Sequence, residues 1–129
     1  MIRISAGQVV LPDRVVVDAE VVVALDGTIA GIERAEREPE FHTLVPGFVD
    51  LQVNGHDDVD VARAEGDDWA RLDALLLAQG VTAWCPTLIT APLDAYRSVL
   101  YRIAERAGDP ALGVVPEILG VHLEGPFLG

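Results

Sequence analysis

The sequence predicts an α/β protein in which a valine-rich β segment precedes a region of alternating strands and helices. Residues 1–43 contain short apolar runs rich in valine, a β-branched residue that suits the pleated surface of a sheet. From residue 44 onward, buried-strand patterns alternate with two stretches of helical periodicity. Such alternation indicates parallel strands joined by right-handed crossovers, as in the first three strands of a (β/α)8 barrel or part of an open doubly wound sheet.

Within residues 1–43, the first predicted domain, strands are expected over five short segments. These are residues 1–5, 9–11, 14–17, 20–25 and 28–33. Asp26-Gly27 lies between the last two, and such a pair predicts a type I′ hairpin turn with positive φ at both positions. Residues 34–40 are charged and contain a proline, so they are expected to form a surface connection.

Residues 44–129, the second predicted domain, are expected to contain three strands separated by two helices. The strands are predicted over residues 44–54, 81–88 and 118–124, and the helices over residues 67–79 and 92–107. Residues 55–65 form a predicted loop, in which Asp57, Asp58 and Asp60 are expected to be solvated.

Capping residues mark the ends of the two predicted helices. Asp67 or Asp68 is suited to cap the first helix, and Thr90 to cap the second. Gly80 follows the first helix, where a residue in the left-handed conformation is common.

The composition argues against several classes of function. The net charge is −12 and there is no lysine, which disfavours binding to nucleic acid or to an anionic membrane. No apolar run approaches the roughly 20 residues that span a bilayer, and no signal-peptide pattern is present, so a cytoplasmic protein is expected. Cys85 is the only cysteine, so the chain forms no internal disulfide. Phosphate-binding glycine loops and a G-x-S-x-G motif are missing as well.

Polar residues close the first and third predicted strands of the second domain. Gln52 and Asn54 are two residues apart, as are His122 and Glu124, so each pair shares one face of its strand. In parallel barrels, inward-facing residues at the carboxyl ends of strands line the active site. Imidazole and carboxylate are ligand types of zinc and iron. The alternative is that these side chains only satisfy hydrogen bonds at the strand ends.

Three segments resemble motifs of the N-acetylglucosamine-6-phosphate deacetylases, a family of the amidohydrolase superfamily. Residues 44–55, LVPGFVDLQVNG, resemble the motif that opens the superfamily's barrel. Residues 80–90, GVTAWCPTLIT, and residues 120–128, GVHLEGPFL, resemble the second-strand and third-strand segments of the deacetylases. The resemblance implies the first three strands of a (β/α)8 TIM-type barrel, preceded by part of a small β-sandwich domain.

The resemblance also implies a metal site and a substrate. Gln52-Val53-Asn54 stands where most amidohydrolases have His-x-His, which implies a single main metal ion, zinc or iron(II). Glu124 would be a ligand. Gln52 and Asn54 would lie near the metal-bound water or a vacant second site, and His122 beside the ligand, so that all three are near metal or substrate. The implied substrate is an amino-sugar phosphate, and the full enzyme is expected to be a homodimer. Two further histidine ligands and the catalytic base are expected beyond residue 129.

Three readings of the chain remain open at this point. The first is a segment of a longer deacetylase, completed by the remainder of the barrel or by a second fragment. The second is a non-catalytic remnant that self-associates, and the third is another amidohydrolase that acts on a cyclic amide. On the first interpretation the 129-residue chain alone is expected to be inactive, because one carboxylate does not make a catalytic metal site. It is also expected to be unstable, because three parallel strands with two helices leave a sheet edge uncovered.

Overall fold

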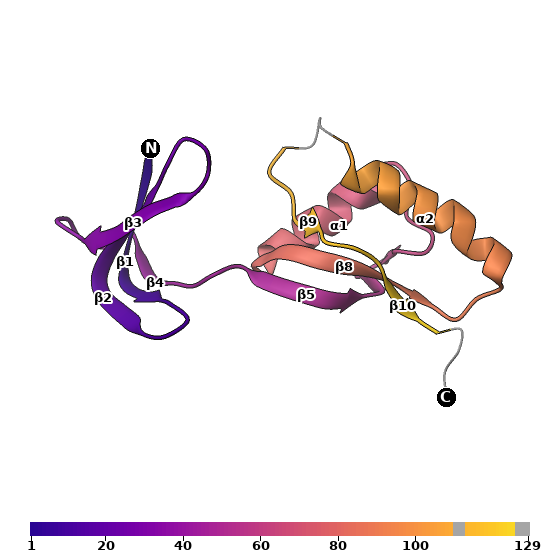
Figure 1. The fold of residues 1–129 in the computed structure, drawn as a ribbon, viewed down its shortest axis with the longest axis horizontal. Coiled ribbons are helices and arrows are strands. Elements are labelled where there is room, and N and C mark those ends of the chain that lie inside the picture. The colour runs from indigo at the N-terminus through magenta and orange to yellow at the C-terminus, as the bar shows by residue number, and fades with distance from the viewer. Residues whose placement is uncertain (110–112, 126–129) are drawn as a thin grey trace. The chain divides into compact units, whose positions relative to one another are not determined.

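The computed structural model describes residues 1–109 and 113–125, which form two compact units, Met1–Pro46 and Gly47–Gly129. A short connection between strands β4 and β5 joins the units (Figure 1). Leu44 lies in the first unit, although the sequence pattern assigned it to the strand that opens the second. No single strand runs from Leu44 to Asn54, because Pro46 lacks an N–H and cannot continue a strand ladder.

The first unit is a four-stranded sheet in the order β3-β2-β1-β4. Its strands are β1 (Ile2–Val10), β2 (Val15–Val23), β3 (Ile29–Arg34) and β4 (Phe41–Leu44). The β1–β2 and β2–β3 pairs are antiparallel, whereas β1 and β4 are parallel. Residues 1–46 therefore form one sheet, and the second layer of a sandwich remains a prediction.

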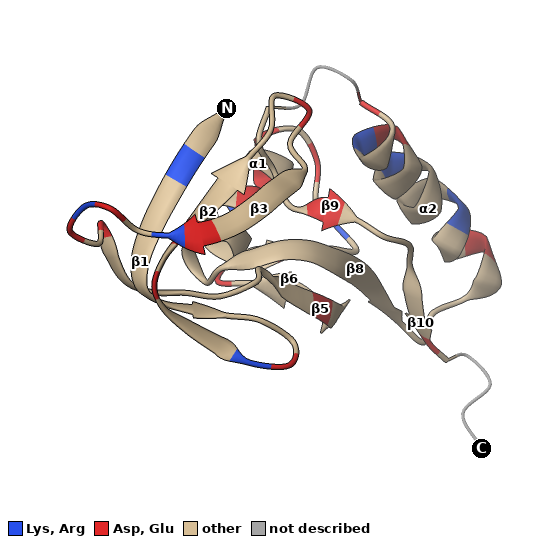
Figure 2. Cartoon of the chain, turned by 60° about the vertical axis from the view of Figure 1, so that its left-hand side comes forward, with Lys and Arg blue, Asp and Glu red and all other residues tan. Residues whose placement is uncertain are grey.

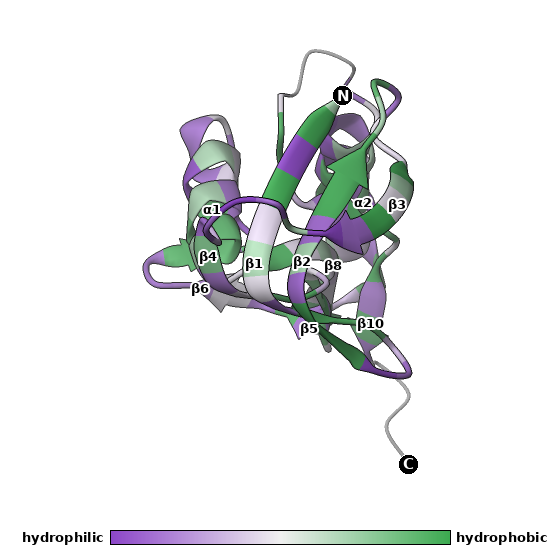
Figure 3. Ribbon diagram, turned by 90° about the vertical axis from the view of Figure 1, so that its left-hand side faces the viewer, coloured by the Kyte–Doolittle hydropathy of each residue, from purple (hydrophilic) through white to green (hydrophobic). Residues whose placement is uncertain are grey.

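Two strands of this unit are longer than the sequence pattern suggested. The predicted segments 1–5 and 9–11 are one strand, β1, and segments 14–17 and 20–25 are largely one strand, β2. Small and polar residues interrupt the apolar pattern (Figure 3), but the ladder uses backbone groups and continues through them. Ala6 and Ala19 face each other in this ladder and are fully buried.

The β2–β3 hairpin exists as expected, but its turn is of another type. Gly27 has φ +85°, whereas Asp26 does not have a positive φ. Gly27 N donates to Ala24 O at 3.1 Å, and Ala24 N donates to Thr28 O at 2.8 Å, which defines a three-residue loop closed by a glycine bulge. The Asp26 carboxylate accepts hydrogen bonds from the Thr28 hydroxyl and N–H, which lower the pKa of Asp26 and favour this loop.

An ion-pair network crosses one face of the first sheet. Glu20 and Glu33 are register partners on β2 and β3, and like charges in that position repel. Arg3 on β1 reaches both carboxylates, at 2.6 Å and 2.8 Å, and Arg37 lies 3.3 Å from Glu20. Figure 2 shows the basic segment of β1 and the charged end of β3. The two guanidinium groups thus compensate the carboxylate of Glu20, which is buried.

The second unit has a parallel sheet in the order β10-β8-β5, with β9 also paired to β8. Its strands are β5 (Phe48–Val53), β8 (Val81–Ile89), β9 (Glu117–Ile118) and β10 (His122–Glu124); its helices are α1 (Asp67–Ala78) and α2 (Leu93–Ala107). Strands consecutive along the chain are neighbours in this sheet, as at the start of a barrel. The α/β architecture is confirmed, whereas closure into a barrel remains a prediction.

Two features of this unit differ from the sequence prediction. The predicted strand 118–124 is split into β9 and β10, and Leu119 N still donates to Trp84 O at 3.0 Å between them. The predicted loop 55–65 contains a small hairpin, β6 (Gly55–His56) with β7 (Val59–Asp60). Strands of two residues are too short to show a periodic pattern in the sequence.

The core of the second unit forms where α1 and α2 pack on β8 and on the segment after β5. Its buried members are Val53, Val59, Val61, Ala64, Trp69, Leu72, Leu76, Val81, Trp84, Leu88, Tyr96 and Ile103. The α1 stripe of Trp69, Leu72 and Leu76 has the spacing that predicted the helix. In the described residues neither helix combines the length and the apolar character that crossing a bilayer requires.

The helix caps differ from the expectation. Gly66 and Pro92 occupy the N-cap positions, and neither helix has a side-chain cap. The expected cap Thr90 instead donates its hydroxyl hydrogen to Glu124 O at 3.2 Å. Gly80 has φ +79°, which confirms the predicted left-handed end of α1.

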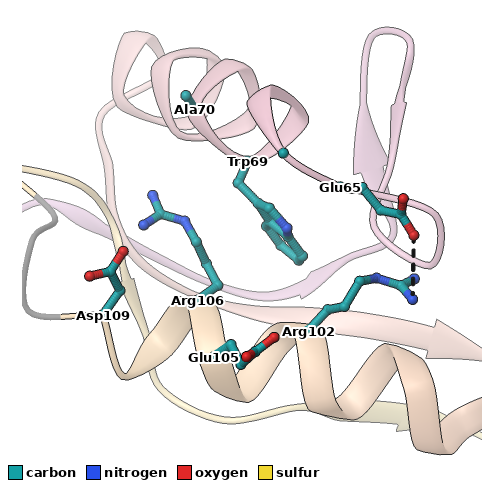
Figure 4. Close-up of a pocket in the computed structure, with 8 residues that line it drawn as sticks. Glu65, Trp69, Ala70, Arg102, Glu105, Arg106 and Asp109 are labelled. Atoms are coloured by element: carbon teal, nitrogen blue, oxygen red, sulfur yellow. Dashed lines mark ion pairs between the residues drawn. The ribbon is translucent and has the colours of Figure 1, made fainter.

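Two arginines of α2 tie it to the segment around α1 (Figure 4). Arg102 Nη2 donates to Ala62 O at 2.8 Å, and Arg106 forms an ion pair with Asp73 of α1. The side chains of Arg106 and Asp73 are both about nine-tenths buried. Desolvation raises the pKa of Asp73, and the charge of Arg106 opposes that rise. The two helices are therefore joined by charge as well as by apolar packing.

Two glycines lie where the backbone approaches another segment closely. A Cβ built on Gly47, the first residue of the second unit, would lie 2.2 Å from the Thr82 side chain. A Cβ on Gly55 would lie 2.2 Å from Val59 O across the β6–β7 hairpin. Neither position has room for a side chain in this arrangement.

Leu72→Ala is expected to lower the free energy of unfolding by about 2 to 5 kcal/mol, because Leu72 is fully buried and its truncation leaves a cavity. Leu77→Ala on the same helix is the matched control, since Leu77 is 38% exposed. Its effect is expected to stay below about 1 kcal/mol. Urea denaturation measures both values, and equal losses would contradict the described core.

Candidate functional site

The polar residues predicted from the sequence gather at the carboxyl ends of β5 and β10. Gln52 lies on β5 and Asn54 directly follows it, while His122 and Glu124 are the two ends of β10. Gln52 Nε2 donates to Glu124 Oε2 at 3.2 Å. The two residues are 72 positions apart in sequence, so the fold alone brings them together.

The Gln52–Glu124 contact spans the strand between them. Because adjacent strands are about 4.8 Å apart, β5 and β10 lie roughly 10 Å apart on either side of β8. Two long side chains meet over β8 only if both rise from the same face of the sheet. Inside (β/α)8 barrels, side chains of alternate strands share a layer in this way.

His122 is held by a buried threonine on β8. His122 is the register partner of Thr87, and its Nδ1 lies 3.3 Å from Thr87 Oγ1. The Thr87 hydroxyl also donates to Cys85 O at 3.3 Å. Which of the two groups donates in the His122–Thr87 contact depends on the tautomer of the imidazole ring. In either tautomer the contact holds Nδ1 at β8, and Nε2 is not part of it.

A hollow of about 450 Å³ lies next to these residues. Thr87 and Ile89 line it from β8, and Asn54, the β6–β7 hairpin and Ala62 line the rest. Asn54 also anchors this hairpin, because Asn54 O accepts a hydrogen bond from Val61 N at 2.9 Å. Asn54 thus lies at the hollow, while Gln52 is paired with Glu124.

The donor groups at this end of the sheet could hold a metal ion only in part. Glu124 offers one carboxylate, and Gln52 approaches it with a neutral amide that adds no competing charge. Over residues 1–109 and 113–125, no three His, Cys, Asp or Glu side chains gather in a group suited to a metal ion. This donor set fits the contribution of one ligand, as expected for Glu124, and does not make a complete site.

Sequence reasoning missed the contacts that hold the hairpin against α1. Asp58 was expected in a solvated turn and is indeed exposed, but it forms an ion pair with Arg71 of α1. The hydrogen bond from Arg71 lowers the pKa of Asp58. Gln79 Nε2, just after α1, contacts His56 Nε2 of β6. The one signal of an arginine partner in the sequence was the number of acidic residues in this loop.

Curated relatives resemble this chain over most of its length. The N-acetylglucosamine-6-phosphate deacetylase of Bos taurus is 46% identical over 89 residues, 66% of this chain and 21% of the relative. The N-acetylgalactosamine-6-phosphate deacetylase of Escherichia coli O157:H7 is 37% identical over 107 residues, 79% of this chain and 27% of the relative. No protein-family model matches the chain.

Solved structures resemble the fold. The N-acetyl-D-glucosamine-6-phosphate deacetylase of Mycobacterium smegmatis has a TM-score of 0.78 at 25% identity, over 100% of this chain and 37% of its own. The enzyme of Thermotoga maritima has a TM-score of 0.76 at 26% identity, over 99% of this chain and 33% of its own.

These relatives and solved structures belong to one class, the deacetylases named for 6-phosphorylated, N-acetylated amino sugars. Within that class, the chain is homologous to the N-terminal part of N-acetylglucosamine-6-phosphate deacetylase, of which it covers about 21%. The resemblance that rested on three sequence segments is thereby confirmed.

The Asp58 carboxyl is expected to titrate below its ordinary value of 3.8, because Arg71 stabilises the ionised form. The ion pair therefore contributes stability above pH 3.8, which is lost as the pH falls through the lowered pKa. Arg71→Gln should return the midpoint toward 3.8, as followed by carboxyl-carbon NMR. Arg63→Gln is the control, because Arg63 lies 3.6 Å from Asp60 instead. An unchanged midpoint in Arg71→Gln would contradict the pair.

Proposed function

We propose that this chain is the N-terminal portion of an enzyme that hydrolyses N-acetylglucosamine 6-phosphate to glucosamine 6-phosphate and acetate. The observation that carries the proposal is the meeting of Gln52 and Glu124 at the carboxyl ends of β5 and β10, in a chain homologous to these deacetylases. The chain spans about a fifth of the length of the curated relatives, 21% for the Bos taurus enzyme. The activity therefore belongs to the complete enzyme.

A divalent metal ion, zinc or iron(II), is part of the proposal. Glu124 would contribute one ligand, and two histidines beyond residue 129 would contribute others. Such an ion lowers the pKa of a bound water molecule and polarises a carbonyl oxygen. The ligand types do not distinguish zinc from iron(II).

The residues of this chain would orient the reacting groups. Gln52 carries an N–H donor beside the Glu124 carboxylate, so it can donate to an oxygen atom bound there, such as that of the acetamide or of water. His122 would present Nε2 on the same strand, two residues from Glu124, while Thr87 holds its other nitrogen. Asn54 and the adjoining hollow would receive part of the sugar.

Completion of the barrel is a further part of the proposal. Within the described residues β5 pairs with β8 alone, so its other edge has unpaired backbone groups. Phe48, Val49 and Leu51 of β5 are all more than half exposed. Unprotected edges and exposed apolar side chains favour association. We therefore expect later strands of the barrel to cover β5. We also propose that the complete enzyme is a homodimer and is cytoplasmic.

Glu124→Gln is expected to reduce acetate release from N-acetylglucosamine 6-phosphate by roughly 100-fold, because ligand and outer-shell changes have effects of that order. The assay uses the complete polypeptide that the gene encodes, with metal content measured in parallel. Glu117→Gln is the matched control. Glu117 is an exposed residue of β9 and pairs with Ala83 near the start of β8, whereas Glu124 pairs with Ile89 at its end. Glu117→Gln should retain full activity.

The same assay separates the competing functions. Comparison with N-acetylgalactosamine 6-phosphate decides between the two substrates for which the relatives are named. Opening of hydantoin or dihydroorotate without acetate release would instead indicate a cyclic amidohydrolase. A metal-free polypeptide with neither activity would support the non-catalytic module and contradict the proposal.

A further inference from the structure

Strand β10 is short, although it carries the candidate site residues His122 and Glu124. It contains only three residues, and it pairs with β8 as His122 with Thr87, Leu123 with Leu88 and Glu124 with Ile89. Residues 119–121 before it are not in a strand, so the ladder is interrupted on that side. A three-residue parallel ladder has few backbone hydrogen bonds to hold the end that carries Glu124.

The described part of the chain does not continue this ladder after Glu124. Gly125 has φ +103°, which turns the chain out of the extended conformation directly after the strand. On the other side, β8 ends at Ile89, the register partner of Glu124. The Glu124 carbonyl therefore lies at the end of the ladder.

Thr90 supplies a partner for this carbonyl. It is the first residue after β8, and its Oγ1 donates to Glu124 O at 3.2 Å. This side-chain bond links β8 and β10 one residue beyond Ile89, which with Glu124 forms the last register pair of the two strands. The carboxylate on the same residue then accepts its hydrogen bond from Gln52 at 3.2 Å.

Tyr96 fixes the segment on which Thr90 lies. From α2, its hydroxyl donates to Ile89 O at 2.9 Å and accepts from Ala91 N at 3.1 Å. The two contacts are on either side of Thr90 in the sequence. Tyr96 is 8% exposed, so its ring is set by the core. The position of Thr90 is thus determined by α2 through a buried side chain.

We propose that Thr90, held by Tyr96, is a positioning residue that fixes the carboxylate of Glu124 against Gln52. Thr90 acts through the backbone carbonyl of Glu124 and does not touch substrate. Its effect on metal binding rests on the proposed function, in which Glu124 is a ligand. Its effect on the Gln52–Glu124 contact does not depend on a metal.

The test uses the complete polypeptide and two measurements. The first is the NMR shift of the Gln52 side-chain amide in metal-free protein, with Glu124→Gln showing the shift when the carboxylate is absent. The second is the zinc dissociation constant. Thr90→Val removes the hydroxyl at similar size and Thr90→Ser keeps it. Ser98→Ala is the control, because its exposed hydroxyl donates to Ala95 O on α2 without reaching β10.

Thr90→Val is expected to move the Gln52 amide resonances toward those of Glu124→Gln and to weaken zinc binding about fivefold, the effect of one lost hydrogen bond. Tyr96→Phe should shift both measurements in the same direction. Thr90→Ser should restore the values of the unsubstituted protein, and Ser98→Ala should leave them unchanged.

Unchanged Gln52 resonances in Thr90→Val, or a Thr90→Ser variant that behaves like Thr90→Val, would overturn the proposal. If Thr90→Val shifts the Gln52 resonances while Glu124→Gln leaves zinc affinity unchanged, the positioning role is supported. The assignment of Glu124 as a metal ligand would then be wrong. The two inferences can therefore fail separately.

Discussion

The pairing of β8 with its two neighbours is the constraint on which the second unit depends. β5 lies on one edge of β8, and β9 and β10 lie on the other. Trp84 and Leu88, on one face of β8, are buried in the core. Thr87 contacts His122 of β10 on the polar side. Since side chains alternate along a strand, a shift of one residue in this register would turn the polar residues toward the helices. Core packing and site geometry are therefore fixed by the same pairing.

Much of the fold could be predicted from the sequence because its main elements have strong periodic patterns. The stripe of Trp69, Leu72 and Leu76 in α1, and the apolar run of β8, indicated their elements directly. The patterns failed where strand pairing continues through small or polar residues, as at Ala6, Gln8 and Ala19, or where a strand has only two residues. The type of the Asp26-Gly27 turn depended on the Thr28 contacts with Asp26, which no pattern of apolar residues encodes.

The site was predictable in position but not in its supporting contacts. Alternation along a strand placed His122 and Glu124 on one face, and the parallel order placed both strand ends together. The partners of Thr87 and Thr90 lie 35 and 34 residues away, and identifying them requires the register between two strands. Thr90 was assigned as a helix cap because threonine is common there, whereas the end of β10 competes for the same hydroxyl. Among the described residues no three His, Cys, Asp or Glu side chains form a group suited to a metal ion, so partners for Glu124 in a metal site could not be inferred from them.

The close approach at Gly47 and Gly55 has a consequence for how this sequence can change over generations. The first glycine lies against Thr82 of β8, and the second against the carbonyl of Val59. Any side chain at either position would displace one end of the segment that carries Gln52 and Asn54. Neither glycine takes part in the proposed chemistry, yet descendants of this protein should replace them less readily than many charged residues on its surface. Loss of either glycine in a related sequence would indicate that the geometry of the site has been abandoned.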